Sequence, residues 1–596
     1  MSVSEQADVV VLGLGPGGEY VAGTLAEAGL DVVGIEAELV GGECPYWGCV
    51  PSKMMIRAGN LLAEAGRVPF LAGEVKVTPD WSRVAGRIRG EATDDWNDQV
   101  AADRLAAKGG RLVRGTGRLT GPRQVTVGER TFQARRGVVL ATGTRPRIPA
   151  VLGLAGTPYW TNRDAMAAKE LPTSMIVLGG GAIGVELAQV FARFQCAVTV
   201  VEGQDRLLSQ EEPEAGELAE KVLREDGVTV LSSTRAREVA HDGAGFIVRL
   251  EGEEAPLRAE RFLVATGRHA DLAALGVDAA GLDPSAPSVR TDGQMRAGEG
   301  LWAIGDITGH GSFTHVSMFQ AEIALRDILG RPGPDADYRA LPRVVFTDPE
   351  IAAVGLTERQ ARDQRLRVRT SLQPIASATR GWIHGPGNEG FIKLVEDADR
   401  GVLVGATSAG PAGGEVLYGL NVAVHAEVPD GHYVTGPLRF ALVFFTIWWA
   451  WMNFTWFASA YDPDDIPYRL TVLVQITGSL VLAAGVPRAF EEGDLRVITL
   501  GYVVLRTALA ALWLRAARSD SSRRRTALRF AAGVTGCQLG WVGMLLLSGP
   551  GATARRHRVD RCRALRPGVG AVGRDDPVAS APHRRTVRTV HPHRAR

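Results

Sequence analysis

The sequence predicts an α/β fold over its first 430 residues and an all-α segment of about four helices after them. Short apolar runs alternate with helical stretches as far as residue 430, a pattern typical of strands joined by crossover helices. Within this part, one glycine-rich strand–turn–helix pattern occurs twice. From Pro437 the chain consists of long apolar blocks rich in Trp and Phe, and residues 552–596 form an Arg-rich, Lys-free tail that we expect to be disordered.

Composition narrows the possible functions. The 596 residues carry a formal net charge of +1, so we expect no nucleic-acid partner. Five cysteines are too few for a disulfide-stapled secreted protein, and the N-terminal sequence "MSVSEQADVVVLGLGPGG" lacks the basic region of a signal peptide. We therefore expect residues 1–430 to be cytoplasmic, where a disulfide is more often catalytic than structural.

The first glycine-rich pattern, "ADVVVLGLGPGG", predicts a Rossmann-like nucleotide-binding domain. The apolar strand Val9–Leu12 is followed by Gly13, Gly15 and Gly18. These permit, in turn, a tight turn, close approach of a pyrophosphate, and packing of a helix on the strand. Glu36 ends the next strand, where its carboxylate can bind the hydroxyl pair of a ribose.

The second pattern, "SMIVLGGGAIGVELA", repeats the device with Gly179, Gly181 and Gly184, and Glu202 ends its second strand. The first glycine and the glutamate are separated by the same number of positions in both copies, which predicts two similar domains binding two dinucleotides. The Glu202 carboxylate would repel the 2′-phosphate of NADP and suits NAD. Arg206 lies close by, so NADP remains the less favoured alternative.

Three further strand ends support this pair of domains. The sequences "VVLATGTRP" and "FLVATGRHA" each end an apolar strand with Ala-Thr-Gly, at Gly143 and Gly267. In "GLWAIGDIT", Asp306 follows a short strand, where a carboxylate can bind a ribityl or ribose hydroxyl. Each could singly be an ordinary strand-end turn, but all three together favour nucleotide binding.

The stretch "GGECPYWGCVPSK" holds Cys44 and Cys49 shortly after Glu36. Structural zinc needs a second ligand pair at short spacing, and the other cysteines are isolated, so we expect no metal site. Cys49 opens a predicted helix, whose N-terminus lowers the pKa of a thiol. The sequence therefore favours a redox disulfide over a structural bridge.

The order of these motifs resembles the pyridine nucleotide–disulfide oxidoreductases, a family that includes dihydrolipoamide dehydrogenase and mercuric reductase. The resemblance covers residues 5–428 and includes "VVFTDPEIAAVGLTE", which is similar to the opening of the family's interface domain. It implies an FAD-binding domain from residues 1–150 and 271–335, an NAD-binding domain at 151–270, and an α+β interface domain at 336–430.

The resemblance also implies roles for individual residues. FAD would bind at the first glycine motif and Asp306, and NAD at the second motif. NADH would reduce FAD, and the electrons would pass to the Cys44–Cys49 disulfide and on to an unknown small-molecule acceptor. By position, Cys49 faces the flavin and Cys44 exchanges with substrate. Lys53 lies by the flavin, and Glu186 is its ion-pair partner.

Family members that reduce disulfide substrates carry a His-Pro pair and a Glu near the end of the interface domain. That His acts as acid–base for the exchanging thiol across a dimer. Residues 390–429 follow the family, but no such motif appears before the apolar blocks. We therefore expect a truncated interface domain, which threatens the family's homodimer. We also expect impaired thiol exchange, since acid–base help is worth roughly 10²–10⁴-fold.

Four apolar blocks, at residues 438–460, 470–486, 497–514 and 529–548, are long enough to span a bilayer. We therefore expect residues 438–548 to contact membrane lipid, with Arg506 as a costly or functional charge inside the third block. The sequence from about 440 to 542 resembles the bacterial low-temperature-requirement A family. Asp464 and Asp465, at the edge of a block, suit a solvated loop better than a cation site.

The sequence thus predicts a membrane-bound enzyme whose reductase part is cytoplasmic. Two alternatives stay open: a membrane protein with an appended, inactive reductase, and a gene-fusion chimera without an evolved joint function.

Overall fold

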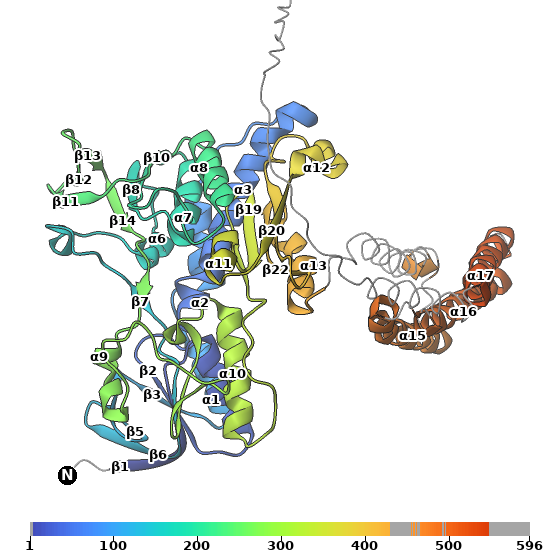
Figure 1. Ribbon diagram of the computed structural model, residues 1–596, viewed down its shortest axis with the longest axis horizontal. Coiled ribbons are helices and arrows are strands. Elements are labelled where there is room, and N and C mark those ends of the chain that lie inside the picture. Colours follow the sequence, from blue (N-terminus) through green and yellow to red (C-terminus); the bar gives the residue numbers. More distant parts are fainter. Residues whose placement is uncertain are drawn as a thin grey trace, which may run out of the picture. The chain divides into compact units, whose positions relative to one another are not determined.

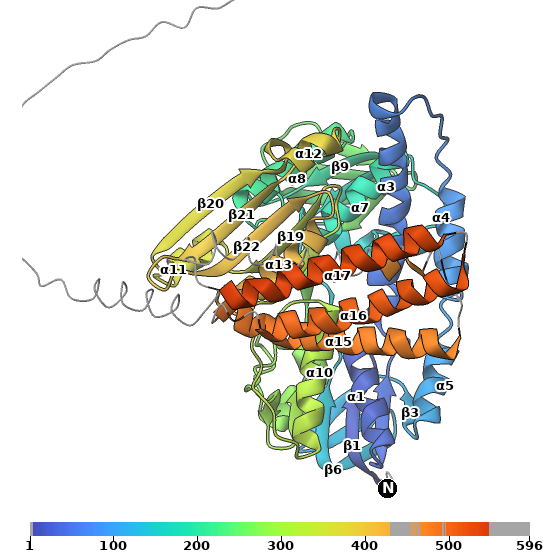
Figure 2. The same cartoon turned by 90° about the vertical axis from the view of Figure 1, so that its right-hand side faces the viewer.

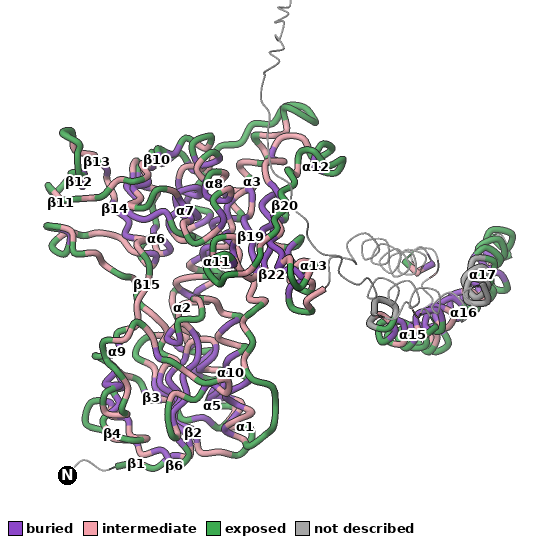
Figure 3. The backbone as a smooth tube through the Cα atoms, viewed as in Figure 1, coloured by how far each residue is buried: buried purple, intermediate pink, exposed green. Residues whose placement is uncertain are grey.

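The computed structural model describes residues 4–428, 454–455, 457–458, 461, 465–491, 494, 496–521 and 523–547. The chain divides into two compact units, Met1–His432 and Tyr433–Arg596, and each is described by itself. The first unit contains three main sheets, and buried residues follow their central strands (Figures 1 and 3).

The first sheet has the order β16-β17-β6-β1-β2-β3, and its core strands are parallel. It is built from two distant parts of the chain, because β17 pairs with β6 across more than 150 residues of sequence. Helices α1 (Pro16–Glu27) and α10 (Thr314–Ile328) pack together beside it. Its strands are β1 (Ser4–Leu12), β2 (Val32–Glu36), β3 (Arg111–Arg114), β6 (Arg130–Leu140), β16 (Arg296–Gly298) and β17 (Leu301–Ala303), extended by the hairpin β4 (Gly117–Gly121) and β5 (Gln124–Val127).

The second sheet is parallel, with the order β10-β9-β8-β14. Its strands are β8 (Ser174–Leu178), β9 (Ala197–Val201), β10 (Thr229–Leu231) and β14 (Arg261–Val264), with helices α7 (Ala182–Arg193) and α8 (Pro213–Glu225). A small antiparallel sheet of β11 (Ala236–His241), β12 (Phe246–Leu250) and β13 (Leu257–Ala259) belongs to the same region. The short strands β7 (Arg145–Pro146) and β15 (Arg268–His269) pair where the chain crosses between the two parallel sheets.

The third sheet is antiparallel, with the order β18-β19-β22-β21-β20. Its strands are β18 (Pro342–Val345), β19 (Glu350–Gly355), β20 (Val368–Pro374), β21 (Phe391–Asp397) and β22 (Val402–Gly410), with helices α11 (Glu358–Asp363), α12 (Thr379–His384) and α13 (Gly413–His425). Lys393 of β21 anchors this sheet to α8, because its buried ammonium lies 3.0 Å from Glu212 and 2.8 Å from Glu214.

The remaining helices of the first unit connect the sheets. They are α2 (Glu43–Tyr46), α3 (Cys49–Leu71), α4 (Trp81–Arg87), a π-helical turn (Ile88–Ala92), α5 (Gln99–Ala107), α6 (Asn162–Ala167) and α9 (Leu272–Leu275), with short 3₁₀ turns between them. Helix α3, which begins at Cys49, packs against α7, the helix that follows the second glycine motif.

In the part of the second unit that the structure describes, three long helices lie side by side: α15 (Ile466–Glu491), α16 (Arg496–Ser519) and α17 (Arg524–Leu547) (Figure 2). Helices α15 and α16 pack closely, since a Cβ on Gly501 would lie 2.4 Å from the backbone nitrogen of Leu482. Among the described residues, two helical segments, Ile466–Val486 and Arg496–Ser519, are long and apolar enough to cross a membrane by length and composition.

These helices bear on the predictions for the apolar blocks. The structure gives two candidate spans in the part that it describes, where the sequence predicted about four. Most of block 438–460, residue 464 and the tail 552–596 lie outside the described residues. Arg506 is buried over the ring of Tyr502, 4.7 Å from its centroid. Asp465 forms an ion pair with Arg515, which occupies the carboxylate that a cation would need.

Candidate functional site

A single cavity of about 2000 Å³ runs through the first unit and is lined by both glycine motifs. Its walls include all the catalytic and nucleotide-binding residues that the sequence predicted except Gly18 and Gly184. The cysteine pair lies in the same wall as Lys53 and Glu186. The structure thus brings together residues that are distant in sequence, from Gly13 to Asp306.

The two glycine turns have the same geometry. Gly13 has φ +91°, and a Cβ on it would lie 2.5 Å from the carbonyl oxygen of Ala141. A Cβ on Gly18 would lie 2.0 Å from the carbonyl oxygen of Gly13, so helix α1 can pack here only without a side chain. A Cβ on Gly15 would meet nothing within 4 Å, because Gly15 faces the open cavity.

The second turn repeats each contact. Gly179 has φ +112°, and its Cβ would lie 2.4 Å from the carbonyl oxygen of Ala265. A Cβ on Gly184 would lie 2.0 Å from the carbonyl oxygen of Gly179, whereas one on Gly181 would meet nothing within 4 Å. Gly15 and Gly181 also stand immediately before α1 and α7, so each open space adjoins a helix N-terminus. Both spaces suit a pyrophosphate.

The predicted ribose-binding carboxylates, Glu36 and Glu202, are held by the glycine turns themselves. Glu36 accepts the backbone N–H of Leu14 at 2.7 Å and that of Glu38 at 2.8 Å. Glu202 accepts the backbone N–H of Gly180 at 2.5 Å. Burial raises the pKa of Glu36 above its usual range. Each carboxylate lines the cavity next to its glycine turn.

Arg206 does not point to the nucleotide end of the cavity. Its guanidinium donates to the carbonyl oxygens of Ser209 at 3.1 Å and Glu211 at 3.3 Å, so it closes its own loop. Arg235 is the guanidinium that lines the cavity beside Gly203, and a Cβ on Gly203 would lie 3.5 Å from its side chain. Arg235 was missed by the sequence reasoning because it lies far from Glu202 along the chain.

The cysteine pair lies between two helix N-termini. Cys49 is the first residue of α3, and its sulfur lies 3.4 Å from the hydroxyl of Thr314, the first residue of α10. Both Cys44 and Cys49 are free thiols in the structure. Their mutual hydrogen bond lowers the pKa of Cys49 to about 6, with help from Thr314 and the charge of Lys53, and raises the pKa of Cys44. The arrangement therefore places a thiolate on Cys49 and a proton on Cys44.

Lys53 and Glu186 form an ion pair beneath the cysteines. The Lys53 ammonium lies 3.0 Å from a Glu186 oxygen and 4.1 Å from the centroid of the Phe346 ring. The second Glu186 oxygen accepts the backbone N–H of Phe346 at 2.8 Å. Residues from α3, α7 and the third sheet's first loop thus meet at one point next to Cys49.

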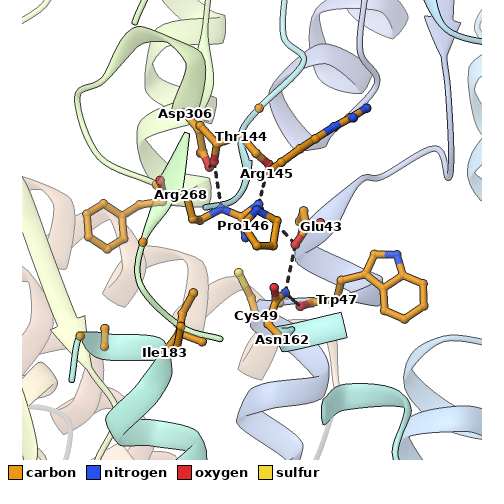
Figure 4. A pocket seen from close by; sticks show the side chains of 18 of the residues that line it. Glu43, Trp47, Cys49, Thr144, Arg145, Pro146, Asn162, Ile183, Arg268 and Asp306 are labelled. Atoms are coloured by element: carbon orange, nitrogen blue, oxygen red, sulfur yellow. Dashed lines mark hydrogen bonds and ion pairs between the residues drawn. The ribbon is translucent and has the colours of Figure 1, made fainter. Parts of the chain in front are cut away.

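A chain of polar contacts links Asp306 to the cysteine loop (Figure 4). The hydroxyl of Thr144 donates to Asp306 at 2.9 Å, and Arg268 donates to that hydroxyl at 2.9 Å. The other end of Arg268 lies 3.5 Å from Glu43, the residue before Cys44. The sequence reasoning missed Thr144, Arg268 and Glu43. Thr144 and Arg268 directly follow Gly143 and Gly267 of the two Ala-Thr-Gly sequences, which was the available signal.

Comparison with known proteins gives three family matches. Residues 7–321 match the pyridine nucleotide-disulphide oxidoreductase family, and residues 341–432 match its dimerisation domain. Residues 421–556 match the bacterial low temperature requirement A protein (LtrA) family. The LtrA match confirms the resemblance expected for about residues 440–542. Together with the two candidate spans, it points to membrane association of the C-terminal segment.

Individual relatives agree with the family models. A dihydrolipoyl dehydrogenase of Halobacterium salinarum is 34% identical over 71% of this chain and 90% of its own length. A mercuric reductase of Shewanella putrefaciens is 32% identical over 70% of this chain and 75% of its own length. The crystal structure of LpdA from Mycobacterium tuberculosis matches with a TM-score of 0.61 and 26% identity, over 71% of this chain and 94% of that one.

A structure of the HOCl-induced flavoprotein disulfide reductase RclA from Escherichia coli matches with a TM-score of 0.63 and 25% identity, over 71% of this chain and 94% of that one. The predicted α/β fold is therefore that of a flavoprotein disulfide reductase, and the chain carries the family's dimerisation domain. The chain belongs to the pyridine nucleotide–disulphide oxidoreductase family, whose members are FAD-dependent enzymes that use NAD(P)H.

Proposed function

We propose that residues 1–430 pass electrons from NADH through FAD to a redox-active disulfide, Cys44–Cys49, and on to a small-molecule acceptor. The observation that carries this proposal is the shared cavity, which is lined by Gly15, Gly181 and Cys49 together. A pair of cysteines between two dinucleotide sites is the arrangement that electron transfer to a disulfide requires.

The residues of the first glycine turn fit FAD. Gly15 leaves open space at the N-terminus of α1, where backbone N–H groups and the helix dipole favour a pyrophosphate. Glu36 is in place for a ribose, and Asp306 for the hydroxyls of a ribityl chain. A bound flavin supplies hydride acceptance from the reduced pyridine nucleotide and an electron pair for the disulfide.

The protein's own residues would control the thiol chemistry. When the Cys44–Cys49 bond takes up an electron pair and one proton, the S–S bond breaks, and the products are a thiol and a thiolate. The lowered pKa of Cys49 assigns the negative charge to Cys49 and the proton to Cys44. The Lys53 ammonium stabilises that charge, and Glu186 fixes Lys53 in place. Cys44 is then the thiol for exchange with the acceptor.

NAD is the proposed pyridine nucleotide. The Glu202 carboxylate at the second glycine turn would lie against the 2′ position of the adenosine ribose, where it repels a phosphate. Arg206 is engaged with its own loop and leaves this repulsion uncompensated. Arg235 is the residue through which NADP would have to be accommodated.

The acceptor step and the quaternary structure follow from the C-terminal end of the reductase. The dimerisation-domain match supports a homodimer, and we infer a shortened interface domain, because the family's His-Pro and Glu do not precede the apolar blocks. Without that acid–base pair, we propose an acceptor that needs no proton for its leaving group. The dimerisation-domain match and the LtrA match overlap at residues 421–432, which supports a reductase part that continues into the LtrA-like part without a linker.

The second candidate, a membrane protein with an appended and inactive reductase, is favoured by the LtrA match alone. One experiment separates the two candidates. The purified full chain is titrated anaerobically with NADH, and the long-wavelength absorbance of a thiolate beside oxidised flavin is followed. We expect the absorbance in the wild type and in Cys196→Ser, whose thiol is buried, and its loss in Cys49→Ser. If the wild type bound flavin but developed no such absorbance, the second candidate, a membrane protein with an appended and inactive reductase, would be favoured.

A further inference from the structure

The loop that contains the cysteine pair, residues 43–49, is held from two sides through Trp47. This segment, here called the redox loop, comprises the short helix α2, Trp47, Gly48 and Cys49. Trp47 lies between the two cysteines in the sequence and lines the cavity. Its backbone carbonyl contacts Asn162 of α6, and its ring contacts Trp96.

The first hold comes from α6. The Asn162 side-chain amide donates to the carbonyl oxygen of Trp47 at 2.7 Å, and its other contact is Glu43 at 3.3 Å (Figure 4). The neighbouring Arg163 donates to Glu43 at 2.9 Å, and its guanidinium lies 5.6 Å from the Trp47 ring centroid. Asn162 is buried, so its hydrogen bonds are shielded from water. The redox loop is therefore attached to α6 at two points, Glu43 and Trp47.

The second hold is Trp96. Its ring stacks on that of Trp47, with the centroids 5.2 Å apart and an interplanar angle of 22°. The Trp96 indole N–H donates to the carbonyl oxygen of Tyr46 at 3.3 Å. The Arg89 guanidinium lies 5.3 Å from the Trp96 ring centroid. The stack and this hydrogen bond thus hold the peptide between the two cysteines independently of the hydrogen bonds from α6.

The turn that presents Trp96 is strained. Asp94, Asp95 and Trp96 have φ of 47°, 54° and 59°, a run of left-handed residues without glycine. The turn follows the π-helical segment Ile88–Ala92, and it is fixed by the buried hydroxyl of Thr93, which donates to the carbonyl oxygen of Ile88 at 3.1 Å. Such conformations persist only where the surroundings enforce them, and they concentrate at functional sites.

We propose that Asn162, Arg163 and Trp96 are positioning residues that hold the redox loop so that the Cys44 thiol keeps its hydrogen bond to the Cys49 sulfur. The hold also keeps both sulfurs within bonding reach while the disulfide opens and re-forms. This inference rests on the proposed function, because the loop matters only if the pair is redox-active. None of the three residues touches a reacting sulfur in the contacts described above.

The hold is tested by the pH at which Cys49 loses its proton. The two-electron-reduced full-length holoprotein is titrated anaerobically over a series of pH values, and the long-wavelength absorbance of the Cys49 thiolate beside oxidised flavin is followed. For the wild type we expect a midpoint near pH 6. In Trp96→Ala, loss of the Cys44 hydrogen bond should raise the midpoint by about one pH unit, which lowers the thiolate–flavin absorbance at pH 6 about fivefold.

Three companion variants separate positioning from general damage. Trp96→Phe keeps a stacking ring and should stay close to the wild-type midpoint. Trp382→Ala removes an exposed tryptophan far along the chain and should leave it unchanged. Asn162→Ser removes the Asn162 hydrogen bonds from α6 and should raise the midpoint. This variant tests the inference if Trp96→Ala fails to fold.

Two outcomes overturn the inference. One is a wild-type midpoint in folded, flavin-containing Trp96→Ala and Asn162→Ser. The other is an equal rise in Trp382→Ala. Failure of the proposed function is distinguishable, because it appears in the wild type itself as a Cys44–Cys49 pair that takes up no electrons from NADH.

Discussion

Replacing glycine by alanine at matched positions of the first turn should separate folding from nucleotide binding. At Gly18 the new methyl group would lie 2.0 Å from the carbonyl oxygen of Gly13, far inside ordinary contact. Backbone atoms cannot move away without displacing α1 from the sheet. Overpacking of this kind costs about 1–3 kcal/mol, and we expect the upper end here. For a unit of this size, the upper end corresponds to a drop of about 3 °C in Tm.

At Gly15 the same substitution should leave the fold intact. Gly15 has φ −62° and ψ −179°, which alanine adopts without strain, and its methyl group would meet no protein atom within 4 Å. The methyl group would instead occupy the space proposed for the pyrophosphate. We expect the Tm of the flavin-free protein to stay within about 1–2 °C of wild type. The affinity for FAD should fall at least about tenfold, equivalent to 1.4 kcal/mol.

The assay compares flavin-stripped and FAD-reconstituted full-length protein for both variants, by thermal melting and by fluorescence of released flavin. The second turn supplies an internal control. Gly184→Ala should destabilise the fold as Gly18→Ala does, whereas Gly181→Ala should raise the KM for NADH and leave FAD bound. If Gly15→Ala retained wild-type FAD affinity while folded, or if Gly181→Ala released FAD, our placement of the two nucleotides would be refuted.

The remaining predictions concern the charges around the cysteines and the second nucleotide. The pKa of Cys49 is lowered to about 6, so its thiolate stabilises the folded state above the pKa of an unfolded thiol, and this contribution is lost as the pH falls through 6. The thiolate–flavin absorbance of the reduced protein should disappear as the pH falls through 6. Persistence of that absorbance at about pH 5 would contradict the assignment of the thiolate to Cys49. Glu186→Gln leaves the Lys53 ammonium unneutralised and should lower the pH midpoint of Cys49 deprotonation, whereas Lys53→Met should raise that midpoint. A shift of the same sign in both variants would show that the ion pair does not act through charge. Glu202→Ala should increase the kcat/KM for NADPH relative to NADH, through Arg235, and an unchanged ratio would remove Glu202 from cofactor selection.

Local sequence patterns predicted the elements whose geometry is set within a few residues. The turns at Gly13 and Gly179 follow from steric rules that act between adjacent strand, turn and helix, so both were predictable from spacing. The position of Cys49 as the first residue of α3 is likewise a local property. These motifs also carry enough information to identify the family, which the family model confirms over residues 7–321.

Contacts between distant segments could not be predicted in the same way. The chain from Asp306 through Thr144 to Arg268 joins three segments that only the folded sheets bring together. Trp96 carries no motif, and its stacking on Trp47 depends on a strained turn for which the sequence offers no glycine. In the C-terminal segment, hydropathy predicted four apolar blocks, whereas the length and composition of the described helices give two candidate spans, because part of the first block lies outside the described residues.

The most direct test of the account is the redox state of the cysteines before and after NADH. The full-length holoprotein is treated anaerobically with one alkylating reagent, reduced with NADH, and treated with an isotopically distinct reagent, and each cysteine is then assigned by peptide mass spectrometry. We predict that Cys44 and Cys49 both take only the second label, and that Cys196, which is buried and has its pKa raised to about 12, takes neither. If Cys44 and Cys49 took the first label, or neither label after NADH had reduced the flavin, the pair would not be the redox centre proposed here.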